Sequence, residues 1–98
     1  MLTVLGNTFT SRVAASLLNA IGLPELIAAT HADYERTALD LARDGARLSS
    51  IRAKLAAHRL THPLFNADSY TRHLEAACAA MWERHRQGQA PGPITIGP

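Results

Sequence analysis

The amino-acid sequence divides into one short apolar run and a series of stretches with helical spacing. The apolar run is MLTVL, residues 1–5, and its Thr and Val content favours a buried strand that Gly6 ends. Because a lone strand leaves its backbone donors and acceptors unpaired, it needs strand neighbours that the rest of the pattern does not supply. The sequence predicts one N-terminal strand in a sheet that the chain does not complete.

Most of the remaining chain carries apolar residues three and four positions apart, which predicts about four α-helices. The first helix begins at a cap formed by Thr10 or Ser11 and stops at Gly22. Residues 24–27 follow as a short turn, because proline suits the first position of such a turn. The fold class expected from this pattern is mainly α, with one strand followed by the helices.

Three further helices are predicted at residues 30–43, 44–60 and 66–88, and the last is stopped by a glycine. Each begins at a side chain that can accept a hydrogen bond from the helix start. These caps are Thr30, Asp44 and Asn66. The last helix has the strongest apolar face of the sequence, and this face is expected to lie in the core. It consists of Tyr70, Leu74, Ala77, Cys78, Met81 and Trp82.

The length of 98 residues allows one small domain or part of a larger one. Hydrophobic residues make up 47% and charged residues 18%, which is typical of a chain with a packed core. We assign residues 1–88 to a partial domain. Residues 89–98 hold three prolines and two glycines, which predicts an extended or mobile tail unless it lies along a partner surface.

The cysteine count and the apolar stretches bear on the compartment. A single cysteine, Cys78, excludes an internal disulfide framework and a multi-cysteine zinc site, and a cytoplasmic location fits best. The uncharged stretch at residues 13–24 is too short to span a membrane. No basic region precedes the apolar residues at the N-terminus, so a secretory signal is not expected.

Charge and histidine content suggest further chemistry only weakly. Five Lys and Arg against one Asp fall between residues 43 and 59, but no aromatic residues interleave, and a solvated helix face is the preferred interpretation. Nucleic-acid binding therefore ranks last among the hypotheses. His58 and His62 have the spacing of two metal ligands on a helix, but Pro63 ends the helix between them and no third ligand stands out. No metal site is predicted.

The segment between the strand and the first helix is the best candidate for a ligand site. Such a loop lies at the carboxyl end of a strand and at the amino end of a helix, where free backbone amides favour an anion such as phosphate. Simple helix capping by these hydroxyl groups is the alternative interpretation, and a structural salt bridge is the alternative for the arginine. The candidate residues are Gly6, Asn7, Thr8, Thr10, Ser11 and Arg12.

Five stretches in a fixed order resemble the extreme C-terminal part of the O-linked N-acetylglucosamine transferases, including their bacterial SPINDLY-like members. They lie at residues 5–18 (LGNTFTSRVAASLL), 38–41, 63–66 (PLFN), 74–75 and 81–83 (MWE). The resemblance covers nearly the whole chain. It implies a glycosyltransferase with two Rossmann-like domains (GT-B type) that transfers N-acetylglucosamine from its uridine diphosphate donor to Ser or Thr of proteins, without a metal or another cofactor. Fucose is the alternative sugar.

In this resemblance, the chain corresponds to the last strand and the closing helices of the donor-binding domain. The Gln and Lys pair, the Gly-His-Thr-Thr segment and the histidines of the family lie upstream of the matched part, so no catalytic residue can be assigned to this chain. We therefore expect a catalytically silent fragment. Its expected partners are the N-terminal remainder of the transferase, or further copies that associate through the strand and the apolar helix faces. A free-standing helical protein-interaction module is the alternative function.

Overall fold

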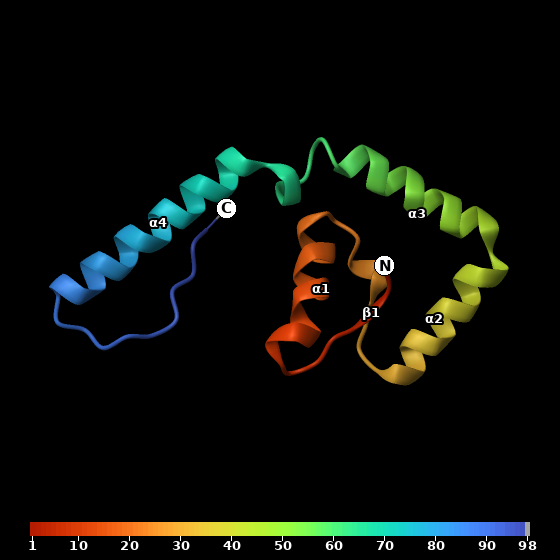
Figure 1. The fold of residues 1–98 in the computed structure, drawn as a ribbon, viewed down its shortest axis with the longest axis horizontal. Coiled ribbons are helices and arrows are strands. Elements are labelled where there is room, and N and C mark those ends of the chain that lie inside the picture. The colour runs from red at the N-terminus through yellow and green to blue at the C-terminus, as the bar shows by residue number, and fades with distance from the viewer. Residues whose placement is uncertain (98) are drawn as a thin grey trace. The chain divides into compact units, whose positions relative to one another are not determined.

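The computed structural model describes residues 1–97 and is mainly helical (Figure 1). The helices expected from the sequence are present, together with a short strand pair. In chain order the elements are β1 (Thr3–Val4), α1 (Phe9–Ala20), the 3-10 helix η1 (Pro24–Leu26), β2 (Ile27–Ala28), α2 (His31–Arg43), α3 (Gly45–His58), the 3-10 helix η2 (Pro63–Phe65) and α4 (Ala67–Arg86). The chain forms two compact units, Met1–Phe65 and a second that starts at Asn66.

The strand at the amino end has a partner within the chain, which corrects the prediction of a single strand. β1 and β2 are parallel, with Thr3 opposite Ile27 and Val4 opposite Ala28. The amide of Leu5 extends the pairing, because it donates to the carbonyl of Ala28 over 2.9 Å. A strand of two residues is too short to show a period, so the sequence pattern assigned β2 to a turn.

The strand pair still has an open side. Within the described residues the sheet has two strands in the order β1-β2, so β1 has a neighbour along one edge only. The chain passes from β1 through α1 to the parallel β2, and this is the strand-helix-strand unit from which parallel sheets are built. Each of the two strands thus has one edge without a strand neighbour among the described residues.

The core of the Met1–Phe65 unit lies where α1 meets the segment leading to β2. Its buried cluster consists of Leu18, Ile21, Leu23 and Leu26, and Leu23 is only 2% exposed. Leu41 of α2 and Ile51 of α3 are partly buried and pack against this cluster. Neither α2 nor α3 has a fully buried residue, so these two helices contribute only partly buried side chains to the core.

The helix starts follow local side-chain chemistry. The side chains of Thr30, Asp44 and Asn66 accept hydrogen bonds from the amides three residues on, which confirms these predicted caps. The prediction for α1 was wrong by two or three residues, since Thr8 is its cap. Thr8 has an extended backbone (φ −92°, ψ 160°), whereas Thr10 and Ser11 already lie inside the helix.

The second unit consists of α4 and the segment that follows it. Gly88 adopts a left-handed backbone (φ +68°) directly after the helix, which confirms the predicted stop. The following segment returns along the helix: the Arg84 side chain donates to the carbonyl of Ala90 over 2.6 Å, and the amide of Gln89 donates to the carbonyl of Arg84. Pro98, the last residue of the predicted tail, lies outside the described residues.

The apolar face of α4 is not buried, so the prediction that it lies in the core was wrong for this unit. Its large side chains are between 50% and 68% exposed. They are Tyr70, Leu74, Met81 and Trp82. The physical reason is that one helix and a short returning segment do not have enough apolar surface to cover the whole stripe. No helix within residues 1–97 is both long and apolar enough to cross a membrane.

Candidate functional site

The predicted ligand loop lies at the carboxyl end of β1 and at the amino end of α1, as expected. The structure brings its polar residues together in a network that is largely closed on itself. The amide of Thr8 donates to Ser11 Oγ over 3.1 Å, and the amide of Ser11 donates to Thr8 Oγ1 over 3.3 Å. These two bonds form a capping box, so the hydroxyl groups of Thr8 and Ser11 cap the helix, as the alternative interpretation expected.

The remaining loop residues have mainly structural contacts. Thr10 Oγ1 lies 3.3 Å from Thr8 Oγ1, and an Arg12 nitrogen donates to the carbonyl of Gly6 over 3.3 Å. A side chain at Gly6 would overlap Ser11 Oγ, so this position needs glycine for its space. Asn7 is exposed, and no hydrogen bond of its side chain occurs within the described residues. The arginine is thus held by a backbone carbonyl rather than by a carboxylate.

Some capacity for an anion remains in the loop. The amides of Thr8 and Ser11 are used by the capping box, but helix geometry leaves those of Phe9 and Thr10 without a carbonyl partner in the helix. The first turn of α1 holds no acidic residue, and Phe9 is 83% exposed beside it. Phe9 and Thr10 are both exposed, so these groups form an open rim at the helix start.

An apolar groove in the Met1–Phe65 unit is the main feature that the sequence pattern missed. It has a volume of about 660 Å³ and is lined by residues of α1, α2 and α3. The first two residues, the segment between α1 and β2, and η2 complete the lining. Of the buried leucines at its base, Leu18 lies at a helically spaced position of α1, whereas Leu23 and Leu26 lie in the segment between α1 and β2. The groove itself was not predictable from the sequence pattern, because it depends on how α1 packs against α2 and α3, which follow it in the chain.

The sequence singled out His58 and His62 by their spacing, but it did not predict the contacts that the two rings make after the last turn of α3. The rings of His58 and His62 stack with centroids 3.7 Å apart. His58 Nδ1 lies 2.8 Å from the carbonyl oxygen of Ile21, and because a carbonyl only accepts, this nitrogen carries the proton. The bond satisfies a carbonyl at the C-terminal end of α1. Within residues 1–97, no group of three or more His, Cys, Asp or Glu side chains could hold a metal ion.

One ion pair links distant parts of the same unit. Lys54 Nζ donates to Glu25 Oε1 over 2.8 Å, and the two side chains are 40% and 32% exposed. Burial is the largest influence and acts to raise the pKa of the Glu25 carboxyl. The hydrogen bond from Lys54, a backbone hydrogen bond and the charges of Lys54 and His58 act in the opposite direction, and the net pKa lies below its ordinary value.

The substitution Glu25→Gln is expected to lower the free energy of unfolding by about 0.5 kcal/mol at neutral pH, the usual size for a partly exposed pair. Because the pKa of Glu25 is lowered by folding, this contribution is present above the unfolded-state pKa and disappears as the pH falls through the folded-state pKa. Urea denaturation at about pH 7 and about pH 2.5 measures the difference. Glu35→Gln is the matched control, since Glu35 forms no ion pair in the described part of the chain. If Glu25→Gln lowers the free energy of unfolding as much at the lower pH, the loss does not come from the ion pair between Glu25 and Lys54.

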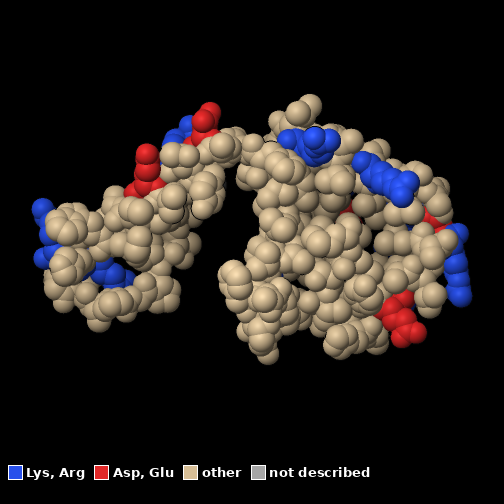
Figure 2. Space-filling model, viewed as in Figure 1, with Lys and Arg blue, Asp and Glu red and all other residues tan. Residues whose placement is uncertain are grey.

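The basic run divides among several environments rather than forming one patch. Lys54 is paired with Glu25, while the other four cations, Arg43, Arg47, Arg52 and Arg59, form no salt bridge within residues 1–97. Figure 2 shows the Lys and Arg side chains in separate areas along α3, with uncharged surface between them. This arrangement supports the interpretation of a largely solvated helix face.

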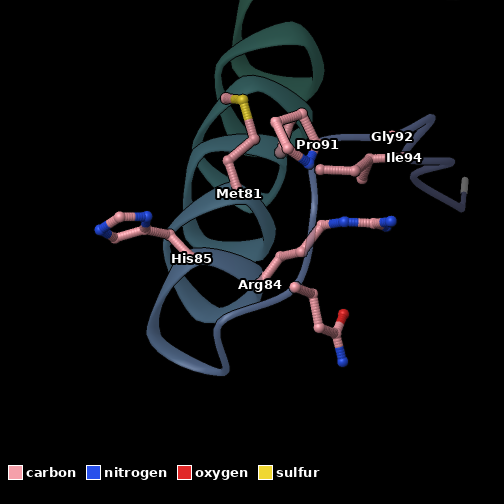
Figure 3. Close-up of a pocket in the computed structure, with 8 residues that line it drawn as sticks. Met81, Arg84, His85, Pro91, Gly92 and Ile94 are labelled. Atoms are coloured by element: carbon pink, nitrogen blue, oxygen red, sulfur yellow. The ribbon is translucent and has the colours of Figure 1, made fainter.

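The second unit has a hollow of its own, of about 540 Å³, between α4 and the returning segment. Figure 3 shows Met81 and Arg84 extending from the helix toward Pro91 and Ile94, while His85 points away from this segment. The guanidinium of Arg84 is already bonded to the returning backbone. Cys78 is exposed and free in this unit.

Comparison with known proteins defines the class to which the strand-helix-strand unit and the following helices belong. The sequence profile described as Glycosyl transferase family 41 matches residues 1–74. The chain therefore belongs to glycosyl transferase family 41, as its sequence resemblance predicted.

Three relatives that the chain matches are N-acetylglucosaminyltransferases by name. The chain is 37% identical over 89 residues to the probable UDP-N-acetylglucosamine–peptide N-acetylglucosaminyltransferase SPINDLY of Hordeum vulgare, covering 91% of the chain and 9% of that protein. It is 36% identical over 95 residues to the UDP-N-acetylglucosamine–peptide N-acetylglucosaminyltransferase of Caenorhabditis elegans, covering 97% of the chain and 8% of that protein. A SPINDLY protein of Oryza sativa is also 36% identical, over 91% of the chain and 10% of its own length. The chain thus spans about a tenth of the relatives it matches.

Proposed function

We propose that this chain is the C-terminal segment of a protein O-linked N-acetylglucosamine transferase and has a structural role there. In the complete transferase, the sugar passes from uridine diphosphate N-acetylglucosamine to Ser or Thr hydroxyls of acceptor proteins. The observation that carries this proposal is similarity along nearly the whole chain to N-acetylglucosaminyltransferases roughly ten times its length. No catalytic residue is assigned to the chain.

The strand-helix-strand unit supports a place in a Rossmann-like donor-binding domain of the GT-B type. Parallel strands joined through a helix are the repeating element of such domains, and their sheets are covered on both faces. The unpaired edge of β1 is then the site at which a neighbouring strand of the same sheet joins. In this placement, the loop at residues 6–12 faces the donor side, and α1 covers one face of the sheet.

Catalytic silence of the isolated chain follows from the physical demands of sugar transfer. The reaction needs a cleft that positions donor and acceptor and that stabilises the departing diphosphate. The loop at residues 6–12 offers the amides of Phe9 and Thr10 on an open rim, with the hydroxyl groups of Thr8 and Ser11 engaged in the capping box. Two amides and one arginine cannot replace a two-domain cleft.

Titration calorimetry of the 98-residue chain with uridine diphosphate tests this proposal. We expect no binding at micromolar concentration and no transfer of N-acetylglucosamine to a Ser- or Thr-containing peptide. A complete member of the family, titrated in parallel, is the positive control. Micromolar binding by the isolated chain would refute its silence.

The proposed partners follow from surfaces that the chain leaves open. The remainder of the transferase would pair with the free edge of β1 and cover the apolar face of α4. In its absence, the same surfaces favour association between copies of the chain. Sedimentation velocity of the calorimetry sample checks this: self-association supports the fragment, and a clean monomer with cooperative melting supports a free-standing interaction module instead.

We place the protein in the cytoplasm, where a free and exposed Cys78 stays reduced.

A further inference from the structure

The segment that follows α4 turns back along the helix through a defined motif. The amide of Gly88 donates to the carbonyl of His85 over 2.9 Å, and the amide of Gln89 donates to the carbonyl of Arg84 over 3.1 Å. Together with the left-handed backbone of Gly88, these two bonds form a Schellman motif. Residues 89–97, which we name the strap, then return alongside α4 (Figure 1).

Arg84 fixes the strap to the helix. Its Nε donates to the carbonyl of Ala90 over 2.6 Å. A Cβ at Gly92 would lie 2.7 Å from a terminal nitrogen of the same guanidinium, so the strap passes directly against this group. Figure 3 shows the Arg84 side chain extending from α4 to the strap at this point. Because a charged donor forms a stronger hydrogen bond than a neutral one, Arg84 acts as the latch of this contact.

The strap faces the helix with one side. Ile94 and Ile96 are partly buried, whereas Pro93, Thr95 and Gly97 are exposed. Such alternation is typical of an extended chain with every second side chain against a surface. The two isoleucines therefore form the apolar side of the strap.

The helix offers a row of small residues to this side. Ala77, Ala80 and Arg84 are partly buried, and they lie three and four positions apart on one side of α4. Ala76 and Ala79 are the same type of residue in the same turns, and they are exposed. The burial of Ala77 and Ala80 thus follows from the position of the strap and not from the residue type.

This row belongs to a longer apolar side of α4. The side consists of residues four, three, four and three positions apart, namely Tyr70, Leu74, Ala77, Met81 and Arg84. Tyr70 and Leu74 are 68% and 50% exposed, and they line no hollow with the strap. The strap therefore lies over the C-terminal half of this side only.

The strap is attached without being tightly packed. Hollows of about 540 and 360 Å³ remain beside it, and both are lined by Arg84 and Ile94. The strap has no charged side chain, and its prolines at positions 91 and 93 have no amide to donate. Its attachment depends on Arg84 and on the two isoleucines, so it can open while α4 stays folded.

From this arrangement we propose that the strap is an autoinhibitory cover, latched by Arg84, that keeps the C-terminal half of this apolar side from packing against α4 of a second copy of the chain. A second α4 fits because alternating spacings of four and three are those of paired helices. With the strap closed, the open stretch from Tyr70 to Leu74 is about 6 Å long, or one turn. With the strap open, it extends to Met81 and is about 16.5 Å long, or three turns.

The inference goes beyond the proposed function, because it concerns a contact inside the second unit and does not depend on whether the chain binds uridine diphosphate. The proposed function is judged on the unaltered chain. The cover is judged on differences between variants, so each can fail alone.

Backbone ¹⁵N relaxation of the full chain measures whether the strap is docked. We expect order parameters of about 0.85 for Ile94 and Ile96, as in a rigid backbone, and Arg84→Ala should lower them. Arg86→Ala is the matched control, because it removes the same charge from the same turn of α4 but lines neither hollow. Values below about 0.6 in the unaltered chain, or an equal fall in both variants, overturn the proposal.

Sedimentation equilibrium measures what the strap prevents. Arg84→Ala is expected to lower the dissociation constant for self-association by about tenfold relative to Arg86→Ala, because two further turns of apolar surface become available. The double substitution Ile94→Ser and Ile96→Ser opens the strap without changing α4 and should give the same gain. If neither variant gains, or if only Arg84→Ala does, the strap is not the cause and the proposal fails.

A further substitution locates the association. Leu74→Ser added to Arg84→Ala should abolish the gain, because Leu74 lies on the apolar side that the copies are proposed to share. Leu60→Ser is the matched control, since Leu60 is 92% exposed and lies outside α4. A gain that survives Leu74→Ser means that the copies associate through another surface, which overturns the proposal.

Discussion

Replacing Leu23 by Ala is expected to lower the free energy of unfolding of the Met1–Phe65 unit by about 3 kcal/mol. Leu23 is 2% exposed and lies in the buried cluster with Leu18, Ile21 and Leu26. The shorter side chain removes apolar contacts and leaves a cavity that a thin core fills only in part. A unit of this length has a total stability of about 3 to 10 kcal/mol, so much of the protein should unfold at moderate temperature.

Urea denaturation followed by far-UV circular dichroism measures this loss. Leu60→Ala is the matched control, because Leu60 is the same residue type but is 92% exposed. We expect the control to change the stability by less than about 0.5 kcal/mol. If the two substitutions have similar effects, the buried cluster does not hold this unit together.

Replacing Gly22 by Ala is expected to cost about 3 kcal/mol, for two separate reasons. Gly22 has a φ of +71°, and a residue with a side chain pays about 1 to 2 kcal/mol in this left-handed region. In addition, the new Cβ would lie 2.6 Å from ring atoms of His62 and 2.9 Å from Nδ1 of His58. The stacked rings must then move, which disturbs the hydrogen bond from His58 to the carbonyl of Ile21.

Gly88 provides a control that separates the two costs. Its φ of +68° is nearly the same, but apart from the glycine itself and its chain neighbours, no heavy atom of the described residues lies within 4 Å of the position where its Cβ would be. Gly88→Ala should therefore cost only the backbone contribution, about 1 to 2 kcal/mol, in the unit that contains it. Thermal unfolding of both variants by circular dichroism gives the comparison. Equal losses would mean that the histidine rings do not constrain the end of α1.

At the candidate site, the sequence predicted features that depend on neighbouring residues but not those that depend on residues distant in the chain. The sequence predicted correctly that residues 6–12 form a loop between a strand and a helix. For the hydroxyl groups of this loop, it left both helix capping and ligand contact open. The structure shows a capping box formed by Thr8 and Ser11, with Arg12 bonded to the carbonyl of Gly6. The groove, by contrast, had no signal in the sequence, because its leucines have the spacing of ordinary core positions.

The sequence by itself determined the helices, their caps at Thr30, Asp44 and Asn66, the stop at Gly88 and membership of the family. These features depend on residues within a few positions of one another, or on a residue pattern that is recognised without coordinates. Tertiary structure alone decided that β2 pairs with β1, that His58 bonds to Ile21 from 37 residues away, and that the unit containing α4 does not by itself cover the apolar face of this helix. The reason is that such contacts join segments whose separation along the chain leaves no local pattern, so only packing selects them.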